Sequence, residues 1–216
     1  MNAFLSLKRG DLALIARNLS FQRTLQLAAR HFCDLNHYYA LEIRMNGNIT
    51  APQTRLMRGE LEILNEEDLK WLKTQVASLT GEDAKDLLVR ILFYENGFRN
   101  CYAYKIDGTI TFLQWLVYPN ENELLRTKYK GRYLPVKPQQ VLIENSFTFP
   151  RYRGFGLMQF ASAELLKIAK AAGYAGAICY VRKENVNALN NLMQIGFKIR
   201  KLVREHKLMG FVWRNW

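Results

Sequence analysis

Apolar residues recur at helical spacing through the first fifty positions of the chain. Asp11 is placed to cap a helix, and the apolar positions of one face follow at Leu12, Ile15, Ala16, Leu19, Leu25, Ala28, Ala29 and Phe32. We therefore expect residues 1–54 to form an N-terminal helical extension packed on a body made by residues 55–216. Because basic side chains lie along the same stretch, peripheral contact of this helix with a membrane surface is the alternative.

The body begins with a pattern that predicts a strand, two helices and a hairpin. Asn65 precedes an acidic first helical turn, Gly97 is well placed to end a helix, and Asp107-Gly108 is typical of a type I′ hairpin turn. The expected elements are a strand at 55–64, helices at 65–79 and 83–96, and hairpin strands at 100–106 and 109–117.

Residues 119–140 connect the hairpin to the next strand and show no clear periodicity. They contain three prolines and the basic side chains Arg126, Lys128, Lys130 and Arg132. A connection of this length is usually a binding loop or a mobile, solvated insert, and the sequence leaves both open.

The most informative segment is a strand, a glycine turn, a helix and a second strand. β-Branched and aromatic residues predict a strand over 141–149, which Pro150 ends by removing a hydrogen-bond donor. The turn Arg151-Tyr152-Arg153-Gly154-Phe155-Gly156 precedes a helix over 157–172, and an apolar strand follows at 177–181. Two strands joined through a helix are expected to be parallel.

The chemistry that this turn favours is anion binding. Gly154 and Gly156 let the backbone approach a ligand closely, and the unpaired N–H groups of the first helical turn point toward it. Arg151 and Arg153 add charges that pair well with phosphate oxygens, so a pyrophosphate fits here. The dinucleotide motif GxGxxG is excluded because Gln159 stands where its third glycine is expected. A Walker loop is excluded because no Gly-Lys-Ser/Thr follows.

The charge of the chain is concentrated in its C-terminal half. The chain of 216 residues carries 31 Lys and Arg against 19 Asp and Glu, a net charge of +12. Residues 1–119 carry a net +1 and residues 120–216 a net +11. This imbalance agrees with nucleic acid, an anionic membrane surface or a small polyanion as partner. Hydrophobic residues make up 49% of the chain, which excludes an intrinsically disordered protein.

The cysteines, the histidines and the overall hydropathy predict a protein without disulfides, metal or membrane spans. Widely spaced Cys33, Cys101 and Cys179 indicate reduced, partly buried thiols. The histidines form no HExxH or HxH pattern, so we expect no metal site. No stretch approaches the roughly 18 apolar residues of a membrane span, and the N-terminus lacks the pattern of a secretory signal, which favours a cytoplasmic protein.

The glycine turn and a second motif resemble those of the GCN5-related N-acetyltransferases (GNATs). Arg151, Gly154 and Gly156 match the family pattern Arg/Gln-x-x-Gly-x-Gly/Ala, which opens the helix that cradles the coenzyme A pyrophosphate. A second family pattern, Asn-x-x-Ala ending in Gly-Phe at the close of the next helix, is matched by Asn185, Ala188, Gly196 and Phe197.

The resemblance covers residues 55–216, most clearly residues 100–216. It implies an α/β (α+β) fold in which helices flank a mixed, mostly antiparallel central sheet, with one parallel strand pair that splays apart. It also implies direct transfer of an acetyl group from acetyl-coenzyme A (acetyl-CoA) to a primary amine, with no metal and no covalent enzyme intermediate. Backbone N–H groups of a strand would polarise the thioester carbonyl.

By the same resemblance, the coenzyme lies where the strand before the glycine turn splays from the next parallel strand. Its pantetheine arm would bond to the strand backbone and to Asn185, which is also placed to cap a helix. The residues expected to bind the coenzyme are Phe147, Thr148, Phe149, Arg151, Arg153, Gly154, Phe155, Gly156, Leu157 and Asn185.

Glu144 is the expected general base. It is the only acidic residue between positions 123 and 164, and it lies mid-strand, near where many family members carry a catalytic carboxylate. Burial would raise its pKa toward neutrality, and an ion pair with a neighbouring Arg or Lys is the alternative role. The family's usual tyrosine acid is replaced here by Leu192, so the leaving thiolate would take its proton from Tyr180, Tyr152 or water, or leave unassisted.

An aromatic group on the hairpin, made of Trp115 with Tyr102, Tyr104, Phe112 and Tyr118, is expected in the core, and the alternative is that it lines an acceptor pocket.

Three other functions fit the same residues. The scaffold would also suit transfer of a longer acyl or an aminoacyl group, or a non-catalytic coenzyme A sensor. A nucleic-acid-binding module needs interleaved basic and aromatic residues, for which residues 198–216 come nearest. That segment equally predicts the two closing strands of the sheet. The acceptor is not readable from the chain, and a homodimer is compatible with it.

Overall fold

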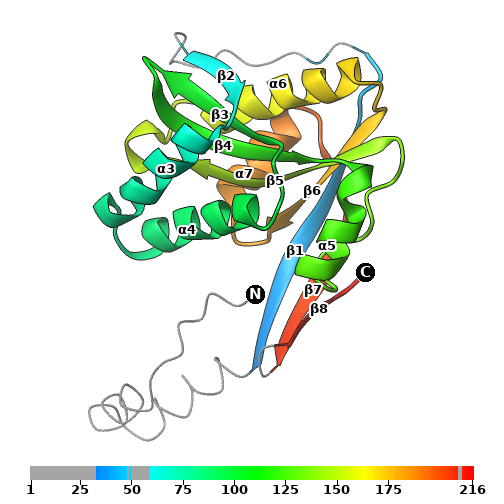
Figure 1. The fold of residues 1–216 in the computed structure, drawn as a ribbon. Helices are drawn as coiled ribbons and strands as arrows, with labels where there is room; N and C mark the ends of the chain where they lie inside the picture. Colours follow the sequence, from blue (N-terminus) through cyan, green and yellow to red (C-terminus); the bar gives the residue numbers. More distant parts are fainter. Residues whose placement is uncertain (1–32, 48, 50–58, 209–210) are drawn as a thin grey trace, which may run out of the picture.

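The computed structural model describes residues 33–47, 49, 59–208 and 211–216. Within them, eight strands form one sheet in the order β2-β3-β4-β5-β6-β1-β7-β8. Every neighbouring pair is antiparallel except β5–β6, which is parallel. Helices α3, α4 and α5 cover one face of this sheet, and α6 and α7 cover the other (Figure 1). The expected fold class, a mixed and mostly antiparallel sheet flanked by helices, is confirmed.

The elements follow the chain in this order: β1 (Cys33–Arg44), β2 (Gly59–Ile63), α3 (Glu66–Gln75), η1 (Val76–Ser78), α4 (Gly81–Glu95), β3 (Cys101–Ile106), β4 (Thr109–Val117), η2 (Pro119–Glu121), α5 (Asn122–Lys128), β5 (Gln140–Thr148), η3 (Pro150–Tyr152), α6 (Leu157–Ala171), β6 (Gly176–Arg182), α7 (Val186–Gln194), β7 (Lys198–Leu208) and β8 (Phe211–Asn215). From residue 59 onward, the strands and helices lie within a few residues of the expected positions. Lys198–Leu208 and Phe211–Asn215 are the two expected closing strands.

Local signals account for the first helix and the hairpin. The Asn65 side chain accepts hydrogen bonds from the backbone N–H groups of Glu67 and Asp68, both at 2.9 Å, and Asp68 accepts one from the Asn65 backbone at 3.1 Å. This reciprocal cap starts α3 where the sequence places it. Asp107 and Gly108 have φ angles of 47° and 72°, the left-handed values that a type I′ turn requires.

The prediction of helix through residue fifty is wrong for residues 33–44. These residues form β1, which lies between β6 and β7 inside the sheet. The strand alternates, with Tyr39, Leu41 and Ile43 facing α6 and α7. This alternation of inward-facing residues with a period of two is visible in the sequence and indicates a strand. The helical spacing of apolar residues ends before it. The sheet therefore includes residues on the N-terminal side of the expected boundary at 54/55, while the predicted helix at 11–32 lies outside the described residues.

The connection at residues 119–140 is more regular than expected. It contains η2 and the short helix α5, which has seven residues and buries Leu125 against the core. The Asn122 side chain ties the two ends of the connection together, because its amide accepts from the Val136 N–H at 2.7 Å and donates to the Val136 carbonyl at 2.9 Å. Val136 itself is buried in the core, so this part of the connection lies against the body of the protein.

Two apolar layers fill the space between the sheet and its helices. Trp115 belongs to the layer under α3 and α4: only 1% of it is exposed, and its indole N–H donates to the Phe98 carbonyl at 2.9 Å. The core interpretation is therefore correct for Trp115, which does not line an open pocket. Cys101 and Cys179 are buried free thiols, while the side chain of Cys33 lies outside the described part of the structure.

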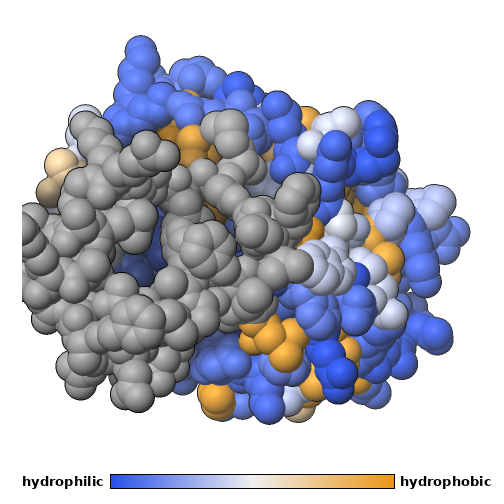
Figure 2. Space-filling view, turned by 90° about the horizontal axis from the view of Figure 1, so that it is seen from below, coloured by the Kyte–Doolittle hydropathy of each residue, from blue (hydrophilic) through white to orange (hydrophobic). Residues whose placement is uncertain are grey.

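Seen from the end where β1, β7 and β8 project, the part of the surface that Figure 2 colours by hydropathy is mostly hydrophilic, with small apolar patches. None of the helices in the described residues combines the length and the apolar character needed to cross a membrane.

Candidate functional site

The parallel strands β5 and β6 pair at their beginnings and then separate. Their pairing covers Gln140–Leu142 of β5 against Gly176–Ile178 of β6, and no pairing follows along the rest of these two strands. Just beyond this point β5 contains a β-bulge: Asn145 has a φ of 55°, and the pairing register with β4 shifts between Leu113 and Trp115. A bulge bends its strand and re-aims side chains, so it explains why β5 turns away from β6.

Glu144 lies where the two strands part, on the face covered by α4 and α5. Its carboxylate accepts three hydrogen bonds, each with a donor–acceptor distance of 3.4 Å. The donors are the Tyr133 hydroxyl, the Asn145 N–H and the Tyr180 N–H of β6. Through these contacts the carboxylate bridges the gap between β5 and β6.

The surroundings of Glu144 favour a proton acceptor at neutral pH. Burial raises its pKa to about 6, although Arg214 lowers it and the Asn145 and Tyr180 N–H groups lower it further. A carboxylate with this pKa is mostly ionised at pH 7 and binds a proton far more readily than an ordinary one. The alternative role, a direct ion pair, has no support among the described residues, since no Arg or Lys lies within ion-pair distance of Glu144.

The glycine turn follows β5 and opens α6. Gly154 and Gly156 have φ angles of 82° and 80°, and Gly156 is the N-cap residue of α6. A Cβ atom at Gly154 would meet nothing within 4 Å, so the space around this position is open. The first helical hydrogen bond is that from Phe160 N–H to the Gly156 carbonyl at 3.1 Å, which leaves the preceding N–H groups at the helix start for a ligand.

The two arginines of the turn have different surroundings. The Arg151 guanidinium lies 4.7 Å from the centre of the Tyr152 ring. Arg153 is paired instead with Asp83 of α4, and its Nε donates to the Thr148 carbonyl at 3.2 Å. Arg153 thus fastens the end of β5 to α4, and it would have to leave Asp83 to reach a phosphate. Arg151 is the better placed of the two predicted phosphate ligands.

The remaining predicted coenzyme-binding residues include three beside the turn in sequence, Phe147, Phe149 and Leu157, and Asn185, which follows β6. Phe147, Phe149 and Leu157 are buried in the core, so only their backbone groups can face a ligand. Asn185 caps α7, and its side chain accepts from the Ala188 N–H at 3.1 Å. The expected helix-capping role of Asn185 is confirmed, whereas its contact with a pantetheine arm stays a prediction.

Two positions bear on which group could protonate the leaving thiolate: Leu192 and Tyr180. Leu192 is buried in the layer between α7 and the sheet, so no polar group from this position reaches the gap. Tyr180 does lie beside Glu144, and its ring packs against Tyr133 and Trp216. Burial and the negative charge of Glu144 raise the pKa of the Tyr180 phenol, which keeps the hydroxyl protonated. A raised pKa also makes it a weaker proton donor.

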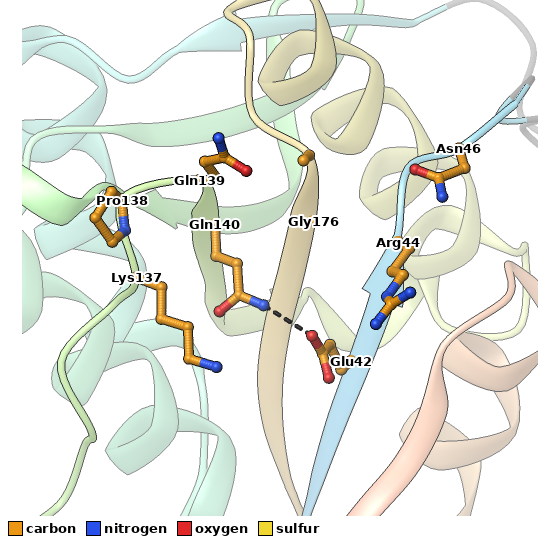
Figure 3. A pocket seen from close by; sticks show the side chains of 9 residues that line it. Glu42, Arg44, Asn46, Lys137, Pro138, Gln139, Gln140 and Gly176 are labelled. Carbon is orange, nitrogen blue, oxygen red and sulfur yellow. Dashed lines mark hydrogen bonds between the residues drawn. The ribbon is translucent and has the colours of Figure 1, made fainter.

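A separate hollow of about 550 Å³ lies at the other end of the β5–β6 pair. It is lined by polar and charged side chains that include Glu42, Arg44 and Lys137 (Figure 3). Glu42 is engaged there by Gln140 at 2.8 Å and by Arg200 at 2.9 Å. Because this hollow adjoins the first residues of β5 and the glycine turn follows the last, it is distinct from the candidate site.

Comparison with solved structures identifies the architecture. An acetyltransferase of the GNAT family from Novosphingobium aromaticivorans, described there as putative, aligns with 84% of this chain and 66% of its own at a TM-score of 0.53 and 15% identity. A GNAT-family acetyltransferase from Colwellia psychrerythraea aligns with 85% of this chain and 61% of its own, at a TM-score of 0.55 and 14% identity. A GCN5-related N-acetyltransferase from Sphaerobacter thermophilus aligns with 89% of this chain and 58% of its own, at a TM-score of 0.55 and 12% identity.

The chain has the GNAT fold. At 12% to 15% identity this likeness establishes the architecture, and the chain spans 58% to 66% of the length of these three structures. No protein-family model matches the sequence, and no curated protein matches it. The resemblance inferred from the glycine turn and the Asn185 motif is thus confirmed at the level of the fold.

Within this GNAT fold the structure brings most of the predicted site together. Glu144, Tyr180 and the backbone of residues 147–149 lie along the opening between β5 and β6, and the glycine turn closes one end of it. The bulge at Asn145 was not predicted, although an asparagine inside a strand is a signal for one, because asparagine tolerates the left-handed conformation that it adopts here. Tyr133, which contacts Glu144, and Arg214, whose charge acts on it, were not predicted either, because they come from other segments and leave no local pattern.

Proposed function

We propose that this chain is an acyl-CoA-dependent acyltransferase that moves an acetyl group from acetyl-CoA directly to a primary amine. The observation that carries the proposal is the position of Glu144 at the opening between β5 and β6, on the strand that runs into the glycine turn. A diphosphate held at the turn would direct the rest of a coenzyme along this opening, toward the carboxylate.

The residues present fit coenzyme A. The turn offers two glycines in left-handed conformation with open space before Gly154, N–H groups at the start of a 15-residue helix, and the nearby charge of Arg151. Beyond residue 142 the β6-facing edge of β5 has no strand partner among the described residues, so its backbone would be available to an extended amide-containing arm. When bound, acetyl-CoA supplies an acetyl group activated as a thioester.

Glu144 would take the proton that the acceptor ammonium must lose before the amine can attack. Backbone N–H groups on the edge of β5 that does not pair with β6 beyond residue 142 would stabilise negative charge on the acetyl oxygen. Holding donor and acceptor together in the opening supplies a further large part of the rate. The leaving thiol departs with a proton from Tyr180 or water, or unassisted.

We expect Gly154→Trp to abolish measurable binding of acetyl-CoA. The indole would fill the space before the turn where the diphosphate would lie, and calorimetric titration measures the affinity. Gly173→Trp is the matched control, because Gly173 also has a left-handed φ, of 91°, and open space around it, but lies beyond the other end of α6. Equal affinity of wild type and Gly154→Trp would contradict the assigned pocket.

A screen for release of free thiol over a panel of amines then separates the candidate activities. Release with acetyl-CoA and an amine supports acetyl transfer, and release only with longer acyl-CoA donors would support the longer-acyl alternative. Binding without release with any amine would instead indicate a coenzyme A sensor.

We expect Tyr180→Phe to lower turnover by less than about tenfold at neutral pH. The raised pKa of this phenol makes it a weak acid, and a thiol is a tolerable leaving group without help. Tyr174→Phe, on a partly buried tyrosine that packs on Tyr118, serves as the control for loss of a hydroxyl. A loss above a hundredfold for Tyr180→Phe alone would establish Tyr180 as the essential acid.

A further inference from the structure

Arg214 of β8 is the most enclosed cation in the described residues that lies near the candidate site. Its side chain is 5% exposed, and its Nε donates at 2.9 Å to Glu205, whose side chain is 3% exposed. Its Nη1 also donates to the Arg132 carbonyl at 2.6 Å. A buried arginine with these fixed partners has little freedom to move.

Aromatic rings surround the same guanidinium. The carbon at its centre lies 4.1 Å from the ring centre of Tyr38, 5.4 Å from that of Tyr133, 5.5 Å from that of Tyr180 and 5.9 Å from that of Trp216. These distances are within the range of cation–π attraction. Strands β1, β6 and β8 and the α5–β5 connection therefore all meet at Arg214.

Arg214 and Glu144 share two neighbours. The Tyr133 hydroxyl donates to Glu144 while the Tyr133 ring lies beside Arg214, and Tyr180 contacts Glu144 through its N–H and Arg214 through its ring. Arg214 thus interacts with two carboxylates. It pairs directly with Glu205, and its charge acts on Glu144 from the other side of the two tyrosines. We infer that Arg214 is a positioning residue that holds Glu144 in its charged form and fixes the two tyrosines beside it.

The other groups around Glu144 do not replace this cation. Arg90 of α4 is the second positive charge that acts on Glu144, but its guanidinium is held by the Asp86 carboxylate at 3.3 Å and by the Ser146 carbonyl at 3.1 Å. The groups that act on Glu144 or are affected by its charge, from all packed elements, are Arg90, Tyr129, Tyr133, Cys179, Tyr180 and Arg214, with the Asn145 N–H. Apart from the two arginines, none of the named side chains is positively charged.

Neutralising Arg214 and neutralising its partner Glu205 should shift the pKa of Glu144 in opposite directions. Removing the cation in Arg214→Gln should raise the pKa of Glu144 from about 6 by roughly one pH unit. Removing the competing carboxylate in Glu205→Gln should lower it, because Arg214 then acts on Glu144 alone. A merely structural disturbance has no reason to shift this pKa in opposite directions.

The pKa of Glu144 is measured directly by NMR titration of protein labelled with carboxyl-¹³C glutamate, with the signal assigned by its loss in Glu144→Gln. Because Arg214→Gln leaves the buried Glu205 carboxylate without its cation, the double variant Arg214→Gln/Glu205→Gln is the second comparison. It should show a higher pKa than Glu205→Gln by about one unit. Arg204→Gln, an exposed arginine on the neighbouring position of β7, is the matched control and should leave the pKa unchanged.

The catalytic consequence rests on the proposed acyl transfer, whereas the NMR result does not. A shift of one unit from about 6 reduces the ionised fraction of Glu144 about fivefold at pH 6 and less than about 1.2-fold at pH 8. Arg214→Gln should therefore lower kcat/KM mainly on the acid side. A Glu144 pKa that is unmoved, or moved in the same direction by both single variants, would overturn the role of Arg214. The expected pKa shifts in a protein without transfer activity would overturn the proposed function alone.

Discussion

Glu144→Gln is expected to lower acetyl-transfer turnover by about 10²- to 10⁴-fold near neutral pH while acetyl-CoA binds with unchanged affinity. The amide cannot accept a proton, and it lies away from the glycine turn that would hold the coenzyme. In the wild type, kcat/KM should fall about tenfold per pH unit below pH 6, because the raised pKa of Glu144 leaves the base protonated there. This acid limb should be absent in Glu144→Gln, and the pH profile of kcat/KM measures it.

Glu164→Gln provides the matched control for this change. Glu164 lies on α6 in a surface pair with Lys167 at 2.8 Å, so its conversion to the amide should leave the pH profile as it is. Undiminished turnover of Glu144→Gln would remove Glu144 as the base.

Leu41→Ala is expected to lower the free energy of unfolding by about 3 kcal/mol, within the usual range for a buried leucine. Leu41 is 1% exposed in β1, opposite Cys179 of β6 and Ile199 of β7. The loss should extend to the candidate site, because β7 and β8 join the rest of the sheet through β1 and carry Glu205 and Arg214. Urea unfolding followed by circular dichroism gives the change in stability.

Leu35→Ala in the same strand is the control for Leu41→Ala. Half of Leu35 is exposed, and its truncation should change stability by no more than about 0.5 kcal/mol. Equal losses for the two variants would show that β1 does not derive its stability from the layer under α6 and α7.

Signals that act over a few residues were sufficient for most of the fold. The cap at Asn65, the turn at Asp107-Gly108 and the glycines around α6 each fix one element where the sequence places it. The strand β1 was mispredicted because its apolar positions directly follow a longer stretch with helical spacing, and its partners in β6 and β7 are remote in the chain. Pairing across such distances overrides a local preference.

Only those parts of the candidate site that lie close together in the sequence were predictable. The glycine turn and Glu144 are adjacent to one strand and were recognised from residue type and spacing. The pairing of Arg153 with Asp83 requires α4 to pack beside the end of β5, and the Arg214 cluster requires four separate segments to meet. Neither arrangement leaves a periodic pattern in the sequence.

The central position of β1 has a consequence for biosynthesis. Tyr38 and its partner Glu205 are 167 residues apart, and ribosomes add about 5–20 residues per second. The strand would therefore emerge about ten to thirty seconds before β7, with both of its edges unpaired. Unpaired strand edges favour association with other chains, so the sheet is exposed to this risk until β7 and β8 have been translated.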